Sequence, residues 1–350
     1  MEVRARRIPA PYRAALALSI DCDGCTIDRL REVFEYWATD VKTRWGPGLG
    51  LPVAASMFAY SRNSGAPPQA AYLDGDRSGL MQAYRNGWID SLHGLGDFAA
   101  DRPCTREMAR RAFDALAEDG IRLPVWTNHG GPENVQNLLK AGAGGDRPGS
   151  PSYLADLADA FGIRFVWPSR LTHVVGQDRH AARGEYYATY PGRSAAARWA
   201  ARATNGLGSA FVRKLGFEPY PGNALLRREA LGDGRNVWTF VRYGRWRHDT
   251  VSRLPSILSS ATLDRLVASG GVMVVYLHIG PSGDETPETL AAGMRTLDDV
   301  ARRHREGSLW VARTADLLAH AAGREGAAPA DTGPSGTKAQ SGGTGQSRRE

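Results

Sequence analysis

The feature that most constrains the fold is an alternation of short apolar runs with helical patterns along most of the chain. The predicted strands are residues 14–20, 53–59, 88–92, 123–127, 163–167, 271–277 and 308–312. The predicted helices cover 28–42, 77–86 and 105–120, and a further one opens at Thr286 and Pro287. Apolar strands that alternate with helices are typical of a mostly parallel α/β fold, either open or closed into a barrel.

Local signals support individual helices. In 28–42 the apolar residues recur at helical spacing, so one face is predicted to be buried: Leu30, Val33, Phe34, Trp37 and Val41. Thr105 is placed to cap the next long helix and Gly120 to end it.

Composition divides the chain into a body and a tail. Hydrophobic residues make up 42% of the 350 residues and charged residues 23%, which is typical of a globular protein. Residues 323–350 are rich in Gly, Ser, Ala, Pro and Thr and lack apolar periodicity, so they are predicted to be a disordered C-terminal tail. The body, 1–322, is predicted to be one catalytic domain.

Residues 179–250 interrupt the alternation and are predicted to be an irregular basic insertion or a lid. Between Tyr186 and Phe217 this region contains arginines and aromatic residues but no acidic residue. Arg193 and Arg198 are therefore candidate substrate contacts, for example to a phosphate or an acidic sugar.

Charge and cysteine content exclude several classes of function. The formal charge is +7, but the basic residues are spread out and only four of the 44 are lysines, so nucleic-acid binding is not predicted. No apolar run approaches the ~20 residues of a membrane helix, and no convincing export signal is present, so the expected location is the cytoplasm. Cys22 and Cys25 have CxxC spacing, but there is no second pair, so a redox or zinc site at these cysteines is not predicted. The oligomeric state leaves no signal in the sequence.

Polar residues follow four predicted strands directly. The first strand runs into Asp21 and Asp23, a pair that suits a site in which one carboxylate binds a metal and the other transfers protons. Another strand is followed by His93 and Asp97, whose i, i+4 spacing lets both reach one metal. Because ligands of parallel α/β folds bind at the carboxyl ends of the strands, these residues are predicted to form one site.

Two further strand ends supply imidazoles. Asn128 and His129 follow residues 123–127 and are candidates for substrate or metal binding. His278 follows the most apolar strand and is placed to act as a general acid or base.

These motifs resemble those of the polysaccharide deacetylase (NodB homology, carbohydrate esterase family four) superfamily, as a divergent member, over roughly residues 14–319. The resemblance implies a distorted (β/α)₇ barrel. In the family's first motif the two aspartates are adjacent, with the first as catalytic base and the second as metal ligand; here Cys22 separates Asp21 from Asp23. Asp97 stands where the family's His-x-x-x-His motif has its second histidine, and His129 is an alternative third ligand. The family's Arg-x-Pro-type motif is not evident.

The resemblance implies a metal-dependent hydrolase that removes an acyl group, in the first instance acetyl, from an amide nitrogen of a glycan or a small sugar-containing metabolite. Asp21 would be the base, His278 the acid, and Asp23, His93 and Asp97 (or His129) the ligands of a divalent ion, Zn²⁺ first and Co²⁺, Mn²⁺ or Ni²⁺ as alternatives.

Two other functions stay open at the level of sequence. Asp21-Cys22-Asp23-Gly24 also fits the opening of a haloacid-dehalogenase-type phosphatase with Asp21 as nucleophile, although that leaves His93 and His278 without a role. The barrel could instead be catalytically impaired and bind a glycan or a partner.

Overall fold

The structure, a computed structural model, describes residues 7–61, 69–99, 101–131, 133–179, 182–190, 192–203, 213–214, 217–244 and 249–326. Most of the predicted tail lies outside these residues. Its first residues, 323–326, instead continue the last helix, α11 (Thr314–Gly326).

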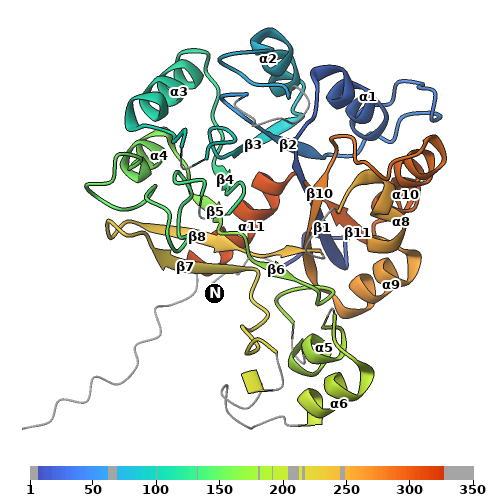
Figure 1. Cartoon of the computed structure of the whole chain (residues 1–350). Coiled ribbons are helices and arrows are strands. Elements are labelled where there is room, and N and C mark those ends of the chain that lie inside the picture. The colour runs from blue at the N-terminus through green and yellow to red at the C-terminus, as the bar shows by residue number, and fades with distance from the viewer. Residues whose placement is uncertain are drawn as a thin grey trace, which may run out of the picture.

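A single curled sheet forms the centre of the molecule (Figure 1). Along its path the strand order is β6-β9-β10-β1-β2-β3-β4-β5-β8-β7, and β11 pairs with β1. These strands pair with one another in parallel except for β7 and β8, which are antiparallel. The strands are β1 (Ala14–Asp21), β2 (Ala54–Met57), β3 (Ile89–His93), β4 (Val125–Thr127), β5 (Phe165–Trp167), β6 (Leu171–Thr172), β7 (Leu226–Ala230), β8 (Asn236–Phe240), β9 (Arg242–Tyr243), β10 (Val272–His278) and β11 (Leu309–Val311).

This architecture confirms the predicted α/β class. The curled sheet is compatible with a barrel, but ten strands lie along its path, so the predicted count of seven β/α units is not confirmed. The helices around the sheet in Figure 1 are α1 (Ile27–Ala38), α2 (Arg77–Arg85), α3 (Arg106–Glu118), α4 (Ala155–Phe161), α8 (Leu254–Ile257), α9 (Ser260–Ser269) and α10 (Pro287–Arg305). No helix in the described part of the chain is both long and apolar enough to cross a membrane.

The two faces of the sheet are buried in two different cores, because side chains alternate along each strand. In β1, Leu16 and Leu18 belong to the large core beneath the surrounding helices, whereas Ala15 and Ala17 belong to the core inside the curl. Leu317 and Leu318 of α11 join that inner core. Helix α11 therefore packs across the inside of the sheet, as Figure 1 shows behind the strands.

The helix caps agree with the sequence at α3 but not at the end of α1. The Thr105 hydroxyl accepts a hydrogen bond from the Met108 amide, and Gly120 has a φ of 73° just after α3. Helix α1 ends at Ala38, four residues earlier than predicted, because Thr39 is extended. Val41 is consequently 56% exposed, and its predicted place in the core is wrong.

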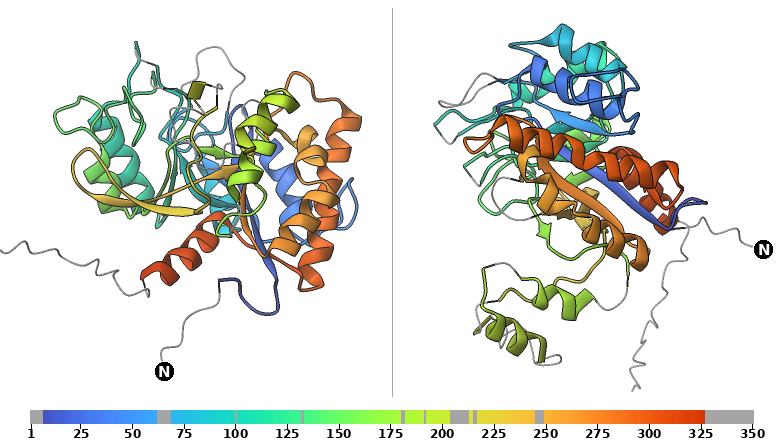
Figure 2. Two further views of the ribbon diagram at one scale, coloured as in Figure 1. Left: turned by 90° about the horizontal axis from the view of Figure 1, so that it is seen from below. Right: turned by 90° about the vertical axis from the view of Figure 1, so that its right-hand side faces the viewer.

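The region 179–250 is only partly the irregular insertion that was predicted. Its first part contains α5 (Ala182–Ala188) and α6 (Ala195–Ala203), which lie outside the ring of helices and share a small aromatic core (Figure 2). Its last part is regular, because β7, β8 and β9 are strands of the main sheet. The charged residues of β7 are accommodated because, after the buried Leu226, its side chains alternate between half-buried and exposed positions at the edge of the sheet.

Candidate metal centre and active site

Three of the predicted site residues occupy the ends of strands and point into the curl. Asp21 ends β1, His93 ends β3 and His278 ends β10, and Asp21 is the register partner of His278. Asp21 and His278 are each an even number of residues from an inward-facing neighbour, Ala17 in β1 and Val274 in β10. The period-2 alternation of these two strands therefore places both side chains on the inner face at the carboxyl ends, and Nε2 of His93 lies 3.6 Å from Oδ2 of Asp21.

Asp23 lies where the imidazoles converge. One carboxylate oxygen, Oδ1, is 2.6 Å from Nε2 of His129. The other, Oδ2, is 3.3 Å from Nδ1 of His93 and 3.2 Å from Nε2 of His278. The structure thus places a histidine from each of the other three predicted strand ends around the carboxylate that follows β1.

Two overlapping groups of side chains could bind a metal ion among the described residues. The first is Asp23, His93 and His129, and the second is Asp21, Asp23 and His278; within each group the ligand atoms lie within 4.8 Å of one another. In the first group the buried Nδ1 of His93 has no hydrogen-bond partner and lies 3.3 Å from Oδ2 of Asp23. An unsatisfied buried atom of this kind is rare in proteins and fits the position of a ligand to a divalent ion.

Asp97 lies behind His129 rather than within either group. Its Oδ1 is 3.4 Å from Nδ1 of His129, whose other nitrogen faces Asp23. A carboxylate on the far nitrogen of a metal-binding histidine is a common orienting contact, because it fixes the tautomer and the ring.

A buried amide network holds His129 in place. The Gln136 side chain accepts from the Leu95 amide at 2.8 Å and donates to the Gly96 carbonyl at 2.6 Å, which ties it to the loop that follows β3. Asn137 accepts from the amide of His129 and donates to its carbonyl. Asn134 donates to the carbonyls of both His129 and Gly96. No sequence motif indicates a role for any of these three side chains.

Asn128, a candidate for substrate or metal binding, is committed to the same loop. Its amide donates to the Leu138 carbonyl at 2.7 Å, and its oxygen accepts from the Leu138 amide and the Trp126 indole, both at 3.0 Å. The side chain therefore closes the loop that presents His129.

Asp21 is bound by an arginine that the sequence analysis also missed. Nη1 of Arg242 is 2.8 Å from one carboxylate oxygen of Asp21, and Nη2 is 3.2 Å from the other. Both residues are fully buried, and the guanidinium carbon lies 3.9 Å from the centroid of the Trp167 ring. The sequence of β8 and β9 contains a signal for the inward position of Arg242. Arg242 lies two residues after the inward-facing Phe240, and residues two apart in extended chain point to the same face of the sheet.

The charges around Asp23 shift the pKa values of the site. Burial lowers the pKa of His93 to about 4. Burial acts the same way on His129, but the hydrogen bond to Asp23 and the charges of Asp23, Asp97 and Asp21 together outweigh it and raise the pKa of His129 to about 9. Burial also opposes protonation of His278, but its hydrogen bond to Asp23 and the charges of Asp23 and Asp21 together raise its pKa. Burial opposes ionisation of Asp23, but the surrounding imidazoles lower its pKa well below the ordinary value.

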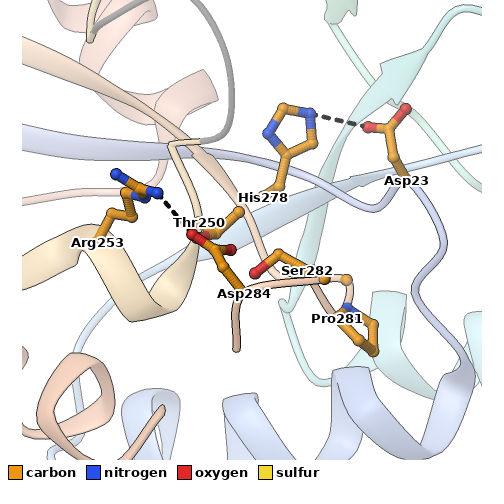
Figure 3. Close-up of a pocket in the computed structure, with 9 residues that line it drawn as sticks. Asp23, Thr250, Arg253, His278, Pro281, Ser282 and Asp284 are labelled. Atoms are coloured by element: carbon orange, nitrogen blue, oxygen red, sulfur yellow. Dashed lines mark hydrogen bonds and ion pairs between the residues drawn. The ribbon is translucent and has the colours of Figure 1, made fainter. Parts of the chain in front are cut away.

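Two cavities meet at Asp23 and His278. The larger, of about 540 Å³, is also bordered by Thr250, Arg253 and the loop from Gly280 to Asp284 (Figure 3). The smaller, of about 220 Å³, is bordered by His93, His129, Lys140, Ser169 and Tyr276 among others. Neither Arg193 nor Arg198 borders these cavities. The Arg198 guanidinium instead donates to the Arg193 carbonyl, and Arg193 lies against Phe217.

Comparison with known proteins gives a distant likeness in structure alone. No protein-family model matches the sequence, and no curated protein sequence matches it. A solved protein from Mycobacterium smegmatis, designated a polysaccharide deacetylase, is similar with a TM-score of 0.47 and 12% identity over 92% of this chain and 96% of the other. The 4-alpha-glucanotransferase from Thermococcus litoralis is similar with a TM-score of 0.37 and 8% identity over 87% of this chain and 38% of the other. Likeness at this level says nothing of activity, which has to be inferred from the side chains.

Proposed function

We propose that the chain is a metal-dependent hydrolase that removes an acyl group, in the first instance acetyl, from an amide nitrogen of a carbohydrate or a sugar-containing metabolite. The observation on which this depends is the convergence of His93, His129 and His278 on Asp23, with the Arg242-bound carboxylate of Asp21 beside them. The carbohydrate part of the proposal depends on the resemblance of the motifs to polysaccharide deacetylases.

Asp23, His93 and His129 are the proposed ligands of a divalent ion, Zn²⁺ in the first instance. One carboxylate and two imidazoles form a usual ligand set of catalytic zinc, which keeps a further position open. The alternative set is less suited, because Arg242 already binds both oxygens of Asp21. An ion bound there would polarise the acyl carbonyl and lower the pKa of a bound water from 15.7 to about 7.

Asp21 and His278 divide the proton transfers in this proposal. Arg242 fixes the carboxylate of Asp21 through two hydrogen bonds, so in this proposal Asp21 is positioned to accept the proton of the attacking water. His278 lies on the neighbouring strand, and its Nε2 is within 3.3 Å of the Tyr276 hydroxyl and 3.2 Å of Asp23. Its raised pKa favours the protonated ring that is needed to protonate the leaving amine.

The imidazoles around Asp23 argue against the phosphatase alternative. His93, His129 and His278 converge on Asp23, and a nucleophilic Asp21 would give them no role.

The test combines metal content with hydrolysis. The purified protein is loaded with zinc, dialysed and analysed beside Asp23→Asn, His93→Ala and Asp21→Asn variants, with His320→Ala as control. His320 lies on α11 against Trp310 and belongs to neither candidate group. Release of acetate is then measured with N-acetylated amino sugars as monomers, oligomers and nucleotide conjugates.

The proposal expects one zinc per chain in the wild type and in His320→Ala, and its loss in Asp23→Asn and His93→Ala. Asp21→Asn should keep the metal and lose acetate release by at least about 100-fold, the usual contribution of a general base. A protein that retains no metal contradicts the proposal. A protein that binds zinc but releases no acyl group from any of these substrates would instead be a binding protein.

A further inference from the structure

Lys140 is a cation on the wall of the candidate site. It borders the 220 Å³ cavity together with Asp23, His93, His129 and His278. Leu139, just before it, has a φ of 54°, in the left-handed region that non-glycine residues seldom adopt. The Leu139 amide is bonded to the Asp146 carboxylate, so this backbone conformation is fixed at the point where Lys140 enters the cavity wall.

The ammonium group of Lys140 has no ion pair or hydrogen bond to any residue that the structure describes. The arginines nearby are different: Arg242 is paired with Asp21, and Arg253 is paired with Asp284 at 2.5 Å. Lys140 is thus an uncompensated positive charge beside the reacting groups.

Ser169 supplies a second unused donor in the same cavity. It also has a positive φ, 62°, and within the described part of the chain its hydroxyl has no recorded hydrogen-bond partner. An ammonium and a hydroxyl on one cavity wall are suited to bind the oxygens of a carboxylate or a phosphate.

The balance of charge favours such a ligand. Asp23 is the one acidic residue among the described residues that border this cavity, and its charge is offset by the imidazoles around it. We propose that Lys140 and Ser169 bind an anionic group, a carboxylate or a phosphate, on the N-acylated substrate, and so select anionic over neutral substrates. This inference rests on the proposed hydrolase function for the identity of the substrate.

The test uses equilibrium binding as well as kinetics. Binding to the zinc-loaded protein is measured by calorimetry with N-acetylglucosamine, N-acetylglucosamine 6-phosphate and N-acetylglucosaminuronic acid. The phosphate and the carboxylate compounds distinguish the two anionic groups. The variants are Lys140→Gln, Lys140→Arg and Ser169→Ala, with Lys42→Gln as control, because Lys42 is an exposed lysine in the segment after α1.

We expect the wild type and Lys42→Gln to bind at least one anionic compound about 10- to 100-fold more tightly than the neutral sugar, in keeping with one charge-assisted contact. Lys140→Gln should lose this preference while it keeps zinc and its melting temperature, Lys140→Arg should restore most of it, and Ser169→Ala should reduce it. In turnover the loss should appear in KM rather than in kcat.

Equal binding of neutral and anionic compounds by the wild type, or binding of none of them, would overturn the inference. So would an anion preference that survives in Lys140→Gln. These outcomes are separate from those of the proposed hydrolysis, because a preference that depends on Lys140 without any release of acetate would retain the anion site and reject the hydrolase.

Discussion

Arg242 of β9 forms a buried ion pair with Asp21 of β1. Its guanidinium donates to both carboxylate oxygens of Asp21, on β1, while it stacks on Trp167 of β5. Removing one member of such a pair leaves the other charge buried without compensation.

The Arg242→Met variant is therefore expected to lose about 3–5 kcal/mol of unfolding free energy. The measurement is urea-induced unfolding, with Arg170→Met as control. Arg170 pairs with Glu229 but is 42% exposed, so its loss should cost no more than about 1 kcal/mol. The double variant Asp21→Leu/Arg242→Met should recover much of the stability and have no activity. Equal costs for the two single variants would contradict the energetic importance of the buried pair.

The role of Asp97 distinguishes two possible sets of metal ligands. The resemblance implies Asp97 as the third ligand beside Asp23 and His93, whereas we propose His129. If Asp97 only orients His129, Asp97→Asn should weaken zinc affinity by about 10- to 100-fold and keep the stoichiometry of one ion per chain. His129→Ala should lose the bound ion on dialysis. Competition with a chelator measures both affinities. Complete loss of zinc in Asp97→Asn, with retention in His129→Ala, would make Asp97 the direct ligand.

Zinc binding should release protons in a way that the site's pKa values predict. In the metal-free protein His93, with a pKa of about 4, is neutral at pH 6, whereas His129, with a pKa of about 9, is protonated. Binding at pH 6 should therefore release about one proton, and between pH 5 and 7 the affinity should rise about tenfold per pH unit. Calorimetry in two buffers of different ionisation enthalpy measures the release; a value near zero or near two would contradict the assignment.

The raised pKa of His129 makes the metal-free protein less stable at alkaline pH. The pKa of His129 lies above its ordinary value of about 6.5, so the stabilisation is fully present below pH 6.5 and is lost as the pH rises through about 9. Thermal melting in chelator should show this decline between pH 6.5 and 9.5. In the His129→Ala variant the decline should be smaller, and an unchanged decline would assign it to other groups.

The loop after β10 provides a matched pair of glycines. A Cβ at Gly280 would lie 1.9 Å from the Asp23 carbonyl oxygen, whereas a Cβ at Gly283 would meet nothing within 4 Å. Gly280→Ala should therefore displace the backbone of Asp23, reduce stability by about 1–3 kcal/mol and weaken zinc binding. Gly283→Ala should change stability by less than about 0.5 kcal/mol. Similar zinc affinities for both variants would show that the close approach does not position Asp23.

The strand ends of the site could be predicted because each depends on a local pattern. An apolar run that ends in polar residues marks both a buried strand and its functional end, as at Ile20 before Asp21 and Leu277 before His278. Arg242 could not be found in the same way, since β9 has only two residues. The arginine-rich sequence around it also resembles a surface insertion.

The choice between Asp97 and His129 depends on contacts that spacing does not encode. His129 is aimed at Asp23 by Asn134, Asn137 and Gln136, whose hydrogen bonds connect two loops some 40 residues apart in sequence. Lys140 likewise follows a residue in a left-handed conformation, and nothing in the sequence around Leu139 indicates that conformation. Tertiary hydrogen bonds therefore determine the position of His129 and of the residues before Lys140, which local sequence patterns do not predict.

Helix α11 has a consequence for the path of substrates. Its Leu317 and Leu318 fill the inside of the curled sheet together with Ala15, Ala17 and Val274, on the strands that end at the site. Side chains therefore fill the inside of the curled sheet beneath Asp21 and His278, so the curl is open at the rim that carries the site and closed below it. In the proposed reaction a polymer would have to lie across the rim with one acyl group directed downward, and the released acid would leave by the opening through which that acyl group entered.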